Sequence, residues 1–288
     1  MPLVAAGKEN SAEIQLHYED HGSGPAVVLI HGWPLSGRSW EKQIPALLAD
    51  GFRVITYDRR GFGQSSQPAS GYDYNVLAQD LNAVVAKLSL EDFALVGFSM
   101  GGGEVARYVG RYGTKRVRQA VFISAVTPYL RKAADNPEGV EPKVFDEIQE
   151  AIAEDRPAFL TSFFKSFYNL RGGPAKEISE EAVRAGWITA VNASPIGTAQ
   201  CVGAWGEDFR ADLKKLDRPA LVVHGTADSI VPLEAAGRRM PSLIKDCRLE
   251  IIEGAPHGLT WTHAQRLNER LLDFLKQGVG AAMAGARA

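Results

Sequence analysis

Six short runs of apolar residues, each bounded by turn-forming residues, follow one another along the chain. Most are rich in valine and isoleucine and lack the alternation of apolar and polar positions that marks a half-exposed strand. Strands buried on both faces have this pattern, which is typical of a parallel sheet covered by helices on each side. The runs predict strands at Ala26–Ile30, Arg53–Tyr57, Phe93–Gly97, Val117–Ile123, Ala220–Val223 and Arg248–Ile252. An earlier segment, Glu13–Asp20, does alternate and predicts a half-exposed edge strand.

Helical patterns separate these predicted strands. Apolar side chains recur three and four positions apart from Val76 to Leu88, from Val105 to Tyr112 and from Leu267 to Leu275. Alternating strands and helices predict an α/β fold, with a mostly parallel central sheet flanked by helices and joined by right-handed crossovers. From Gln277 onward the glycine- and alanine-rich sequence predicts a frayed end.

One long stretch interrupts the alternation and shows no strand pattern. It contains two helical stripes, Val144–Ile152 and Phe159–Phe167, and Ser194 followed by Pro195 predicts the start of another helix. We interpret this stretch as a helical cap inserted over the C-terminal edge of the sheet. The expected organisation is a core formed by residues 1–126 and 210–288 around a cap formed by residues 127–209.

Composition and charge exclude several classes of protein. The 288 residues carry a formal net charge of −2 and a pI near 6.3, so we expect no nucleic-acid partner, because nucleic-acid-binding domains are usually basic. The longest obvious apolar run, Ala26–Ile30, is far shorter than the roughly 20 residues of a membrane span. Residues 1–10 lack a signal-peptide pattern, so we expect a soluble, cytoplasmic protein with no membrane contact. Cys201 and Cys247 are too few for a disulfide framework and are expected only to pack.

The strongest chemical motif is the sequence Gly97-Phe98-Ser99-Met100-Gly101, which lies between a predicted strand and a predicted helix. A strand, a sharp turn and a helix are the context of a nucleophile elbow, in which a strained turn exposes the serine hydroxyl above the sheet. Glycines flank the serine because strand and helix approach each other closely there. The alternative is a serine in an ordinary glycine-rich turn.

A serine nucleophile needs a base, and the base needs a carboxylate that orients it. In this architecture they follow in the order serine, acid, histidine. Asp228 comes just after the predicted strand Ala220–Val223, and His257 just after Arg248–Ile252, so both should lie at the C-terminal edge of the sheet. For Asp228 the alternative is a turn-forming residue. The other histidines fit the role of base less well, being too early in the chain, at a strand end or at the start of a helix: His17, His21, His31, His224 and His263.

Stabilising the oxyanion requires two backbone N–H donors. We expect them from Met100, which follows the serine, and from Trp33, in the loop after the strand Ala26–Ile30. Pro34 restricts the backbone of Trp33. His31, in the same loop, is interpreted as a structural residue bonded to loop backbone.

No motif indicates a cofactor. The segment Asp58–Ser65 contains Gly61 and Gly63 but lacks the Lys-Ser/Thr pair of a phosphate loop, so we interpret it as a structural turn that supports the site. No cluster of His, Cys, Asp or Glu has metal-ligand spacing. We therefore expect neither a metal nor an organic cofactor.

Taken together, these motifs resemble those of the α/β-hydrolase superfamily, and within it the cofactor-free bacterial haloperoxidase, perhydrolase and aryl-esterase family. The resemblance covers nearly the whole chain outside the cap. Related dehalogenases and epoxide hydrolases carry Asp at the nucleophile position, and Ser99 argues against both. The matching segments are HGWPLSG (His31–Gly37), YDRRGFGQSSQP (Tyr57–Pro68), VGFSMGGGEVARY (Val96–Tyr108), HGTAD (His224–Asp228) and GAPHGLTWTH (Gly254–His263).

The resemblance implies a function. By position, Ser99, Asp228 and His257 are similar to the family's catalytic triad, and Trp33 and Met100 to its oxyanion donors. It implies a serine esterase for small acyl esters or carboxylic acids, whose acyl-enzyme reacts with water or with hydrogen peroxide to give a peracid that oxidises halide. It also implies a homo-oligomer, trimeric or higher. The alternatives are a carbon–carbon-bond hydrolase or acyltransferase on the same triad, or a non-enzymatic ligand receptor.

The substrate pocket is expected to be small and apolar. Aromatic stripes at helical spacing are often core rather than pocket, so the cap phenylalanines could serve either purpose. The candidate lining residues are Trp33, Phe98 and Met100 from the core, Phe163, Phe164 and Trp205 from the cap, and Trp261 beyond the His257 loop.

Overall fold

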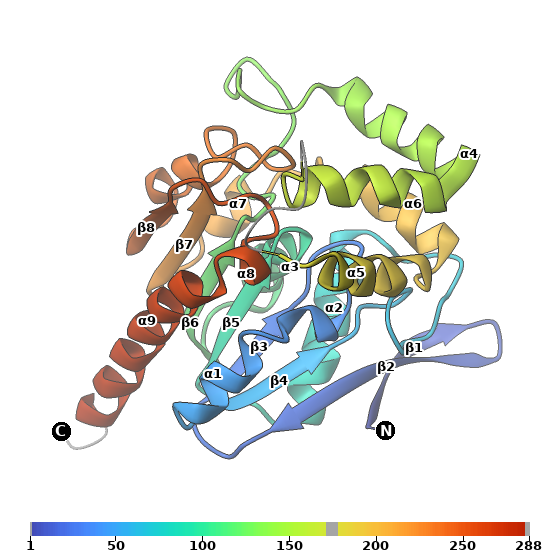
Figure 1. The fold of residues 1–288 in the computed structure, drawn as a ribbon. Helices are drawn as coiled ribbons and strands as arrows, with labels where there is room; N and C mark the ends of the chain where they lie inside the picture. Colours follow the sequence, from blue (N-terminus) through green and yellow to red (C-terminus); the bar gives the residue numbers. More distant parts are fainter. Residues whose placement is uncertain (1, 171–177, 286–288) are drawn as a thin grey trace.

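The computed structural model describes residues 2–170 and 178–285 and contains an eight-stranded sheet with the order β1-β2-β4-β3-β5-β6-β7-β8 (Figure 1). The first strands pair antiparallel, β1 with β2 and β2 with β4, and the remaining pairs are parallel. The strands are β1 (Leu3–Glu9), β2 (Ala12–His21), β3 (Ala26–Ile30), β4 (Arg53–Tyr57), β5 (Phe93–Phe98), β6 (Val117–Ile123), β7 (Ala220–Gly225) and β8 (Cys247–Ile252).

All seven strands expected from the sequence are present with nearly the same bounds. The segment Glu13–Asp20 was expected at the edge of the sheet, but it belongs to β2, which pairs with β1 on one side and β4 on the other. The additional strand, β1, was not predicted, because most of its side chains are exposed or only half-buried. It forms a hairpin with β2 and owes its place to backbone pairing at the sheet edge, which an apolar pattern does not reveal.

Helices cover both faces of the sheet (Figure 1). One face carries α2 (Tyr74–Lys87) and α3 (Met100–Tyr112), which contact each other, and the other carries α1 (Ile44–Ala49) and α9 (Ala264–Gly285). No helix within residues 2–170 and 178–285 is long and apolar enough to cross a membrane. The short elements are the 3₁₀ helices η1 (Gly37–Trp40) and η2 (Gly237–Ser242) and the helices α7 (Arg210–Leu213) and α8 (Leu259–Thr262).

The C-terminal helix corrects one expectation. The end predicted to fray from Gln277 is helical as far as Gly285. Alanine is the best helix former, so a glycine- and alanine-rich segment can continue a helix that packing has already begun. The side chain of Gln119 in β6 donates to the carbonyl of Phe274 at 2.7 Å, and Gly278 lies so close to Gln119 that a Cβ atom would clash.

The cap consists of α4 (Pro142–Phe167), α5 (Glu180–Val191) and α6 (Pro195–Ala204). Helix α4 contains both predicted stripes, and its backbone is non-helical at Asp155, whose carboxylate accepts from the Ala158 N–H and so restarts the helix. Ser194 caps α6, as its position before Pro195 predicted. Hydrogen bonds from Ser194 N to Gly61 O, at 2.7 Å, and from Trp33 Nε1 to Thr198 O, at 3.1 Å, attach α6 to the loops that follow β4 and β3. The cap therefore covers the C-terminal ends of the strands.

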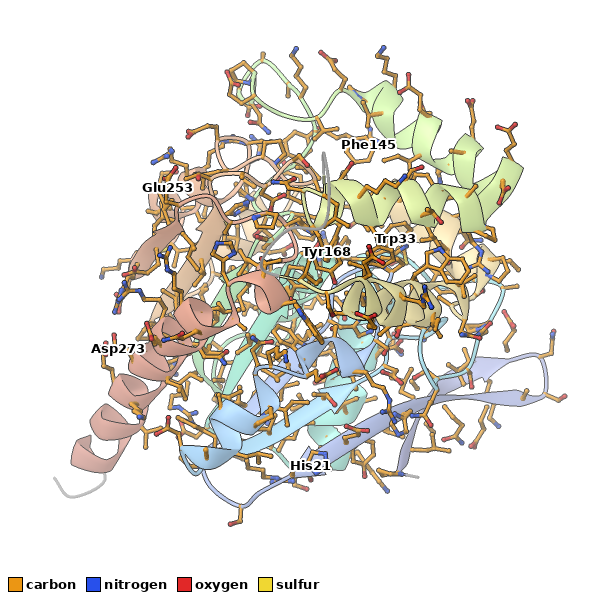
Figure 2. All side chains as sticks on the ribbon, in the orientation of Figure 1. His21, Trp33, Phe145, Tyr168, Glu253 and Asp273 are labelled. Atoms are coloured by element: carbon orange, nitrogen blue, oxygen red, sulfur yellow. The ribbon has the colours of Figure 1, made fainter. Side chains whose placement is uncertain are left out.

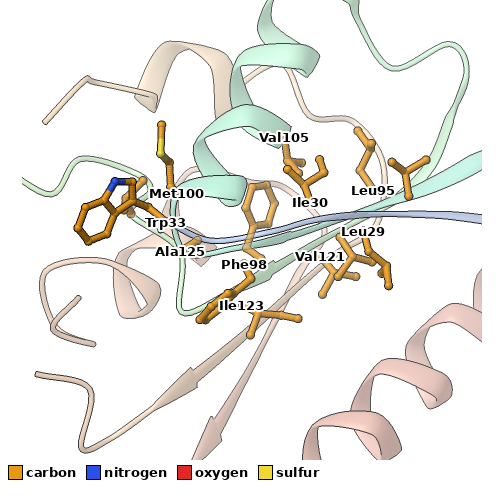
Figure 3. Packing of buried hydrophobic residues seen from close by; sticks show 14 of the residues in the cluster. Leu29, Ile30, Trp33, Leu95, Phe98, Met100, Val105, Val121, Ile123 and Ala125 are labelled. Carbon is orange, nitrogen blue, oxygen red and sulfur yellow. The ribbon is translucent and has the colours of Figure 1, made fainter. Parts of the chain in front are cut away.

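Strands β3, β5 and β6 form the centre of the core and are buried on both faces. Figure 3 shows Ile30 beside Val105 of α3 on one face, and Leu29 beside Val121 on the other. The uninterrupted apolar runs in the sequence reflect this burial on both sides.

Three backbone segments meet closely beside the end of β5. A Cβ atom on Gly97 would lie 2.5 Å from the carbonyl oxygen of Gly101, and one on Gly101 would lie 2.3 Å from that of Ile30. The obstructing atoms belong to backbone, which cannot rotate away. Glycine at these positions therefore brings the end of β3, the end of β5 and the start of α3 into direct contact.

Replacing Gly101 should be costly because the added methyl group meets backbone. We expect Gly101→Ala to lower the free energy of unfolding by about 1–3 kcal/mol, measured by urea denaturation. Gly203→Ala is the control, since the added atom on α6 meets only the Gln149 amide at 3.6 Å, and it should stabilise by about 0.5–1 kcal/mol. Equal changes in the free energy of unfolding for the two variants would contradict the explanation by close backbone contact.

Candidate active site

Ser99 occupies the turn between β5 and α3 in a strained conformation. Its φ of 54° and ψ of −118° lie in a region that residues with a side chain rarely adopt. The surrounding backbone holds it there: Ser99 N donates to Ile123 O at 2.8 Å, and Ser99 O accepts from the N–H groups of Gly102 and Val126. The strained turn expected from the motif is confirmed.

The three residues proposed for a triad lie in one continuous hydrogen-bonded chain. His257 Nε2 is 2.9 Å from Ser99 Oγ, and His257 Nδ1 is 2.8 Å from Asp228 Oδ2. Asp228 follows β7 and His257 follows β8, so the topology brings them to the edge of the sheet where β5 also ends. With the proton on Nδ1 directed at the carboxylate, Nε2 is free to accept the serine proton.

Asp228 is an ionised carboxylate in a buried position. Burial by itself would raise its pKa, but the adjacent His257 and His224 imidazoles hold the pKa well below its ordinary value. Its other oxygen, Oδ1, accepts the N–H groups of Ile230 at 3.0 Å and Val231 at 2.8 Å. His224 lies at the end of β7, and its Nε2 is 2.9 Å from Val231 O and 3.4 Å from Asp228 Oδ2. The carboxylate is therefore charged and fixed in direction.

Aromatic rings enclose the imidazole of His257. Phe98 lies at 5.2 Å and Phe167 at 5.1 Å between ring centroids. Phe98 was among the candidates, whereas Phe167 was not assigned to the site. Its signal was present in the sequence, because Phe159, Phe163 and Phe167 are spaced four apart and share one face of α4.

The loop after β3 lies directly against the nucleophile. A Cβ atom on Gly32 would stand 3.1 Å from Ser99 Cβ and closer still to the Phe98 ring. Trp33 follows in this loop and is buried, and its peptide bond to Pro34 is cis. Met100, the first residue of α3, is also buried. Both residues expected to supply oxyanion donors therefore flank Ser99.

The Trp33 indole connects the core to the cap. It packs against Trp205 at 4.9 Å, Phe163 at 5.1 Å and Phe159 at 6.3 Å, and Figure 2 shows it beneath α4. Phe163, Trp205 and Phe145 also line an apolar cavity of about 310 Å³ whose wall includes residues from both halves of α4. Three candidates for the pocket are thereby brought together.

Two other residues predicted to line the substrate pocket, Phe164 and Trp261, lie away from the cavity. Phe164 is buried inside the cap against Phe163, Phe167 and Tyr168. Trp261 lies in α8, with the ammonium group of Lys42 over its ring at 4.6 Å. Neither residue lines the apolar cavity, and the core candidates Trp33, Phe98 and Met100 do not line it either. The aromatic pattern alone did not distinguish these packing residues from those at the cavity.

His31 holds the loop backbone, as expected of a structural residue. Its Nδ1 donates to Gly32 O at 2.9 Å, and its Nε2 accepts the backbone N–H of Arg59 at 3.0 Å. Burial, and then the charge of Arg59, lower the pKa of His31 well below its ordinary value, so the imidazole is neutral.

The segment Asp58–Ser65 supports the same region. Asp58 accepts the N–H groups of Gly37 at 2.7 Å and Gln64 at 2.8 Å, which ties this turn to the loop after β3. The prediction of a structural turn is confirmed. Among the residues that the structure describes, no group of three or more His, Cys, Asp or Glu could hold a metal ion.

Comparison with known proteins agrees with this geometry. A family model described as the alpha/beta hydrolase fold matches residues 25–264. A putative non-heme chloroperoxidase from Synechocystis is 54% identical and covers 96% of this chain and 100% of its own. A bifunctional esterase/perhydrolase from Acinetobacter calcoaceticus is 36% identical and covers 91% and 96%. The crystal structure of a bromoperoxidase from Bacillus anthracis superposes with a TM-score of 0.91 at 48% identity, covering 96% of this chain and 99% of its own.

The neutral His31 should make folding sensitive to acid. Its folded-state pKa lies below the value near 6.5 of the unfolded chain, so the unfolded state binds the proton first as pH falls. Stability should therefore be lost below about pH 6.5, at up to about 1.4 kcal/mol per pH unit. His31→Asn cannot titrate, yet its amide can still donate to Gly32 O. Urea unfolding at pH 7.5 and 5.5 should show a smaller loss in this variant, and identical losses would contradict the argument.

Proposed function

Because the chain belongs to the alpha/beta hydrolase fold family, and within it to the non-heme haloperoxidases, we propose that it is a serine esterase that can also transfer its acyl group to hydrogen peroxide. The observation that carries the proposal is the chain of hydrogen bonds of 2.9 and 2.8 Å that links Ser99, His257 and Asp228. The relatives' names, which include an esterase/perhydrolase, favour ester chemistry over carbon–carbon cleavage on the same triad.

In the first half of this reaction Ser99 Oγ attacks the carbonyl carbon of a small ester while His257 Nε2 takes the hydroxyl proton. Asp228 stabilises the imidazolium that forms. The N–H groups of Trp33 and Met100 bind the negative oxygen of the tetrahedral intermediate. The proton then passes from His257 to the departing alcohol, the carbon–oxygen bond breaks, and an acyl-enzyme remains on Ser99. A carboxylic acid can acylate Ser99 in the same way with loss of water.

In the second half a small nucleophile attacks the acyl-enzyme and gives its proton to His257. The bond between the acyl carbon and Ser99 Oγ then breaks, and His257 passes the proton to Oγ, which restores the free serine. Water yields the carboxylic acid, and hydrogen peroxide yields the peracid. The peracid then oxidises bromide or chloride to the hypohalous acid and is itself reduced to the carboxylic acid. The protein thus supplies general base catalysis and oxyanion stabilisation.

The cap defines the size of the substrate in this proposal. Rings from the cap close over Trp33, and the adjacent cavity of about 310 Å³ is lined mainly by apolar side chains. A site of this kind favours short or compact apolar esters. The homo-oligomeric state and the cytoplasmic location expected from the sequence stay predictions.

Ser99→Ala should abolish both activities together because both pass through one acyl-enzyme. We expect the hydrolysis of p-nitrophenyl acetate, and the bromination of monochlorodimedone with acetate and peroxide, to fall by several orders of magnitude. Asp228→Asn should lower both rates through the wrong His257 tautomer. Ser242→Ala, at an exposed serine of η2, is the control and should keep both rates. Bromination that persists in Ser99→Ala would refute the common intermediate.

Replacing an aromatic ring that lines the cavity with a smaller side chain should weaken the preference of the enzyme for short acyl groups. Phe163→Leu enlarges the space beside Trp33, so the ratio of kcat/KM for p-nitrophenyl hexanoate to that for the acetate should rise about tenfold. Phe164→Leu makes the same chemical change one position along α4, where the side chain does not line the cavity, and should leave the ratio near its original value. A shift in both variants would indicate general loosening of the cap.

A further inference from the structure

A buried ion pair outside the triad lies next to the site. The guanidinium of Arg59, just after β4, and the carboxylate of Glu104 in α3 are both fully buried. Arg59 Nε donates to Glu104 Oε1 at 2.5 Å, and the hydroxyl of Tyr57 donates to the other carboxylate oxygen. No step of the proposed reaction uses these groups directly.

Arg59 also holds the loop that carries Trp33. Its Nη2 donates to the carbonyl of His31 at 2.7 Å, and its backbone N–H donates to His31 Nε2 at 3.0 Å. One residue thereby joins α3, which begins with Met100, to the loop after β3. These are the two segments from which the proposed oxyanion donors come.

The contacts of Arg59 reach the Trp33 N–H through the peptide plane. His31 Nδ1 at 2.9 Å and the Leu35 N–H at 3.0 Å both donate to the carbonyl of Gly32. In a trans peptide the C=O and the N–H point in opposite directions, so fixing the Gly32 carbonyl also fixes the direction of the Trp33 N–H. Arg59 holds His31, and His31 holds this peptide.

We propose that Arg59, held by Glu104, is a positioning residue that sets the separation and direction of the two oxyanion donors, Trp33 and Met100. The inference rests on the proposed function, which supplies the oxyanion. Stability alone does not explain a fully buried ion pair, because replacing such pairs with apolar side chains is often neutral or stabilising.

The neighbouring residue provides a matched comparison. Arg60 forms a second buried ion pair, with Nε and Nη2 each 2.6 Å from the carboxylate of Asp80 in α2. Its further bond runs to Ala6 O in β1, away from the loop after β3. The two pairs are adjacent in sequence and similar in burial, but only the Arg59 pair touches both oxyanion segments.

The test removes each pair completely, so that no charge is left unpaired. The first variant combines Tyr57→Phe, Arg59→Met and Glu104→Leu, and the control combines Arg60→Met and Asp80→Leu. For each, thermal unfolding, kcat and KM for p-nitrophenyl acetate and the Ki of phenylboronic acid are measured. The boronate forms a tetrahedral adduct on the serine and reports binding in the oxyanion site apart from turnover.

In the Arg59 variant we expect kcat to fall about 10²-fold with KM nearly unchanged, and the Ki of phenylboronic acid to rise by a similar factor. The Arg60 control should keep both values near wild type, whatever its unfolding temperature. An Arg59 variant that folds and keeps the wild-type kcat and Ki would overturn the proposal.

If the triple variant does not fold, Glu104→Gln provides the test. It retains the shape of the side chain and an oxygen for Arg59 but loses the charge. We expect kcat and boronate affinity to fall together, and an unchanged pair of values would overturn the proposal. Failure of the proposed function is a separate result, seen as a wild-type protein without esterase activity or a Ser99→Ala variant that keeps it.

Discussion

Direct contact between three backbone segments is the constraint on which the site depends. Gly97 and Gly101 let the end of β5, the start of α3 and the end of β3 approach without intervening side chains. This contact holds Ser99 in a conformation with positive φ, and it places the loop with Trp33 beside the serine. Ser99 keeps this strained conformation because backbone hydrogen bonds to β6 and to the loop after it hold the turn in place.

Buried charge is the second organising feature, and each buried charge has defined partners. Asp228 is held by backbone N–H groups and by His257, while Glu104 is held by Arg59 and Tyr57. Such groups are costly to bury unless they are paired, so their partners restrict where each can lie. His31 avoids the cost by remaining neutral. The consequence is a set of polar groups held in fixed directions, which the proposed stabilisation of an oxyanion requires.

The cap completes the site through aromatic contacts. Trp33 lies between the core loop that contacts Ser99 and the cap rings of Phe163 and Trp205. One residue thus joins the loop that lies against the serine, through its backbone, to the aromatic rings of the cap, through its indole. Ser99 itself is only 6% exposed, so in the proposed reaction few water molecules can reach the acyl-enzyme.

Seven of the eight strands, the serine turn and the residues that follow β7 and β8 could be predicted from the sequence. These features depend on local signals: apolar runs, glycine spacing and the position of Asp228 and His257 after a strand. Other features depend on which surfaces of distant segments pack together, and these appear only in the tertiary structure. Phe167 lies against His257 while Phe164 and Trp261 pack elsewhere, because the packing of α4 and α8 selects the face of each helix that meets the site. The pairing of Arg59 with Glu104 joins residues 45 positions apart, and no local pattern brings them together.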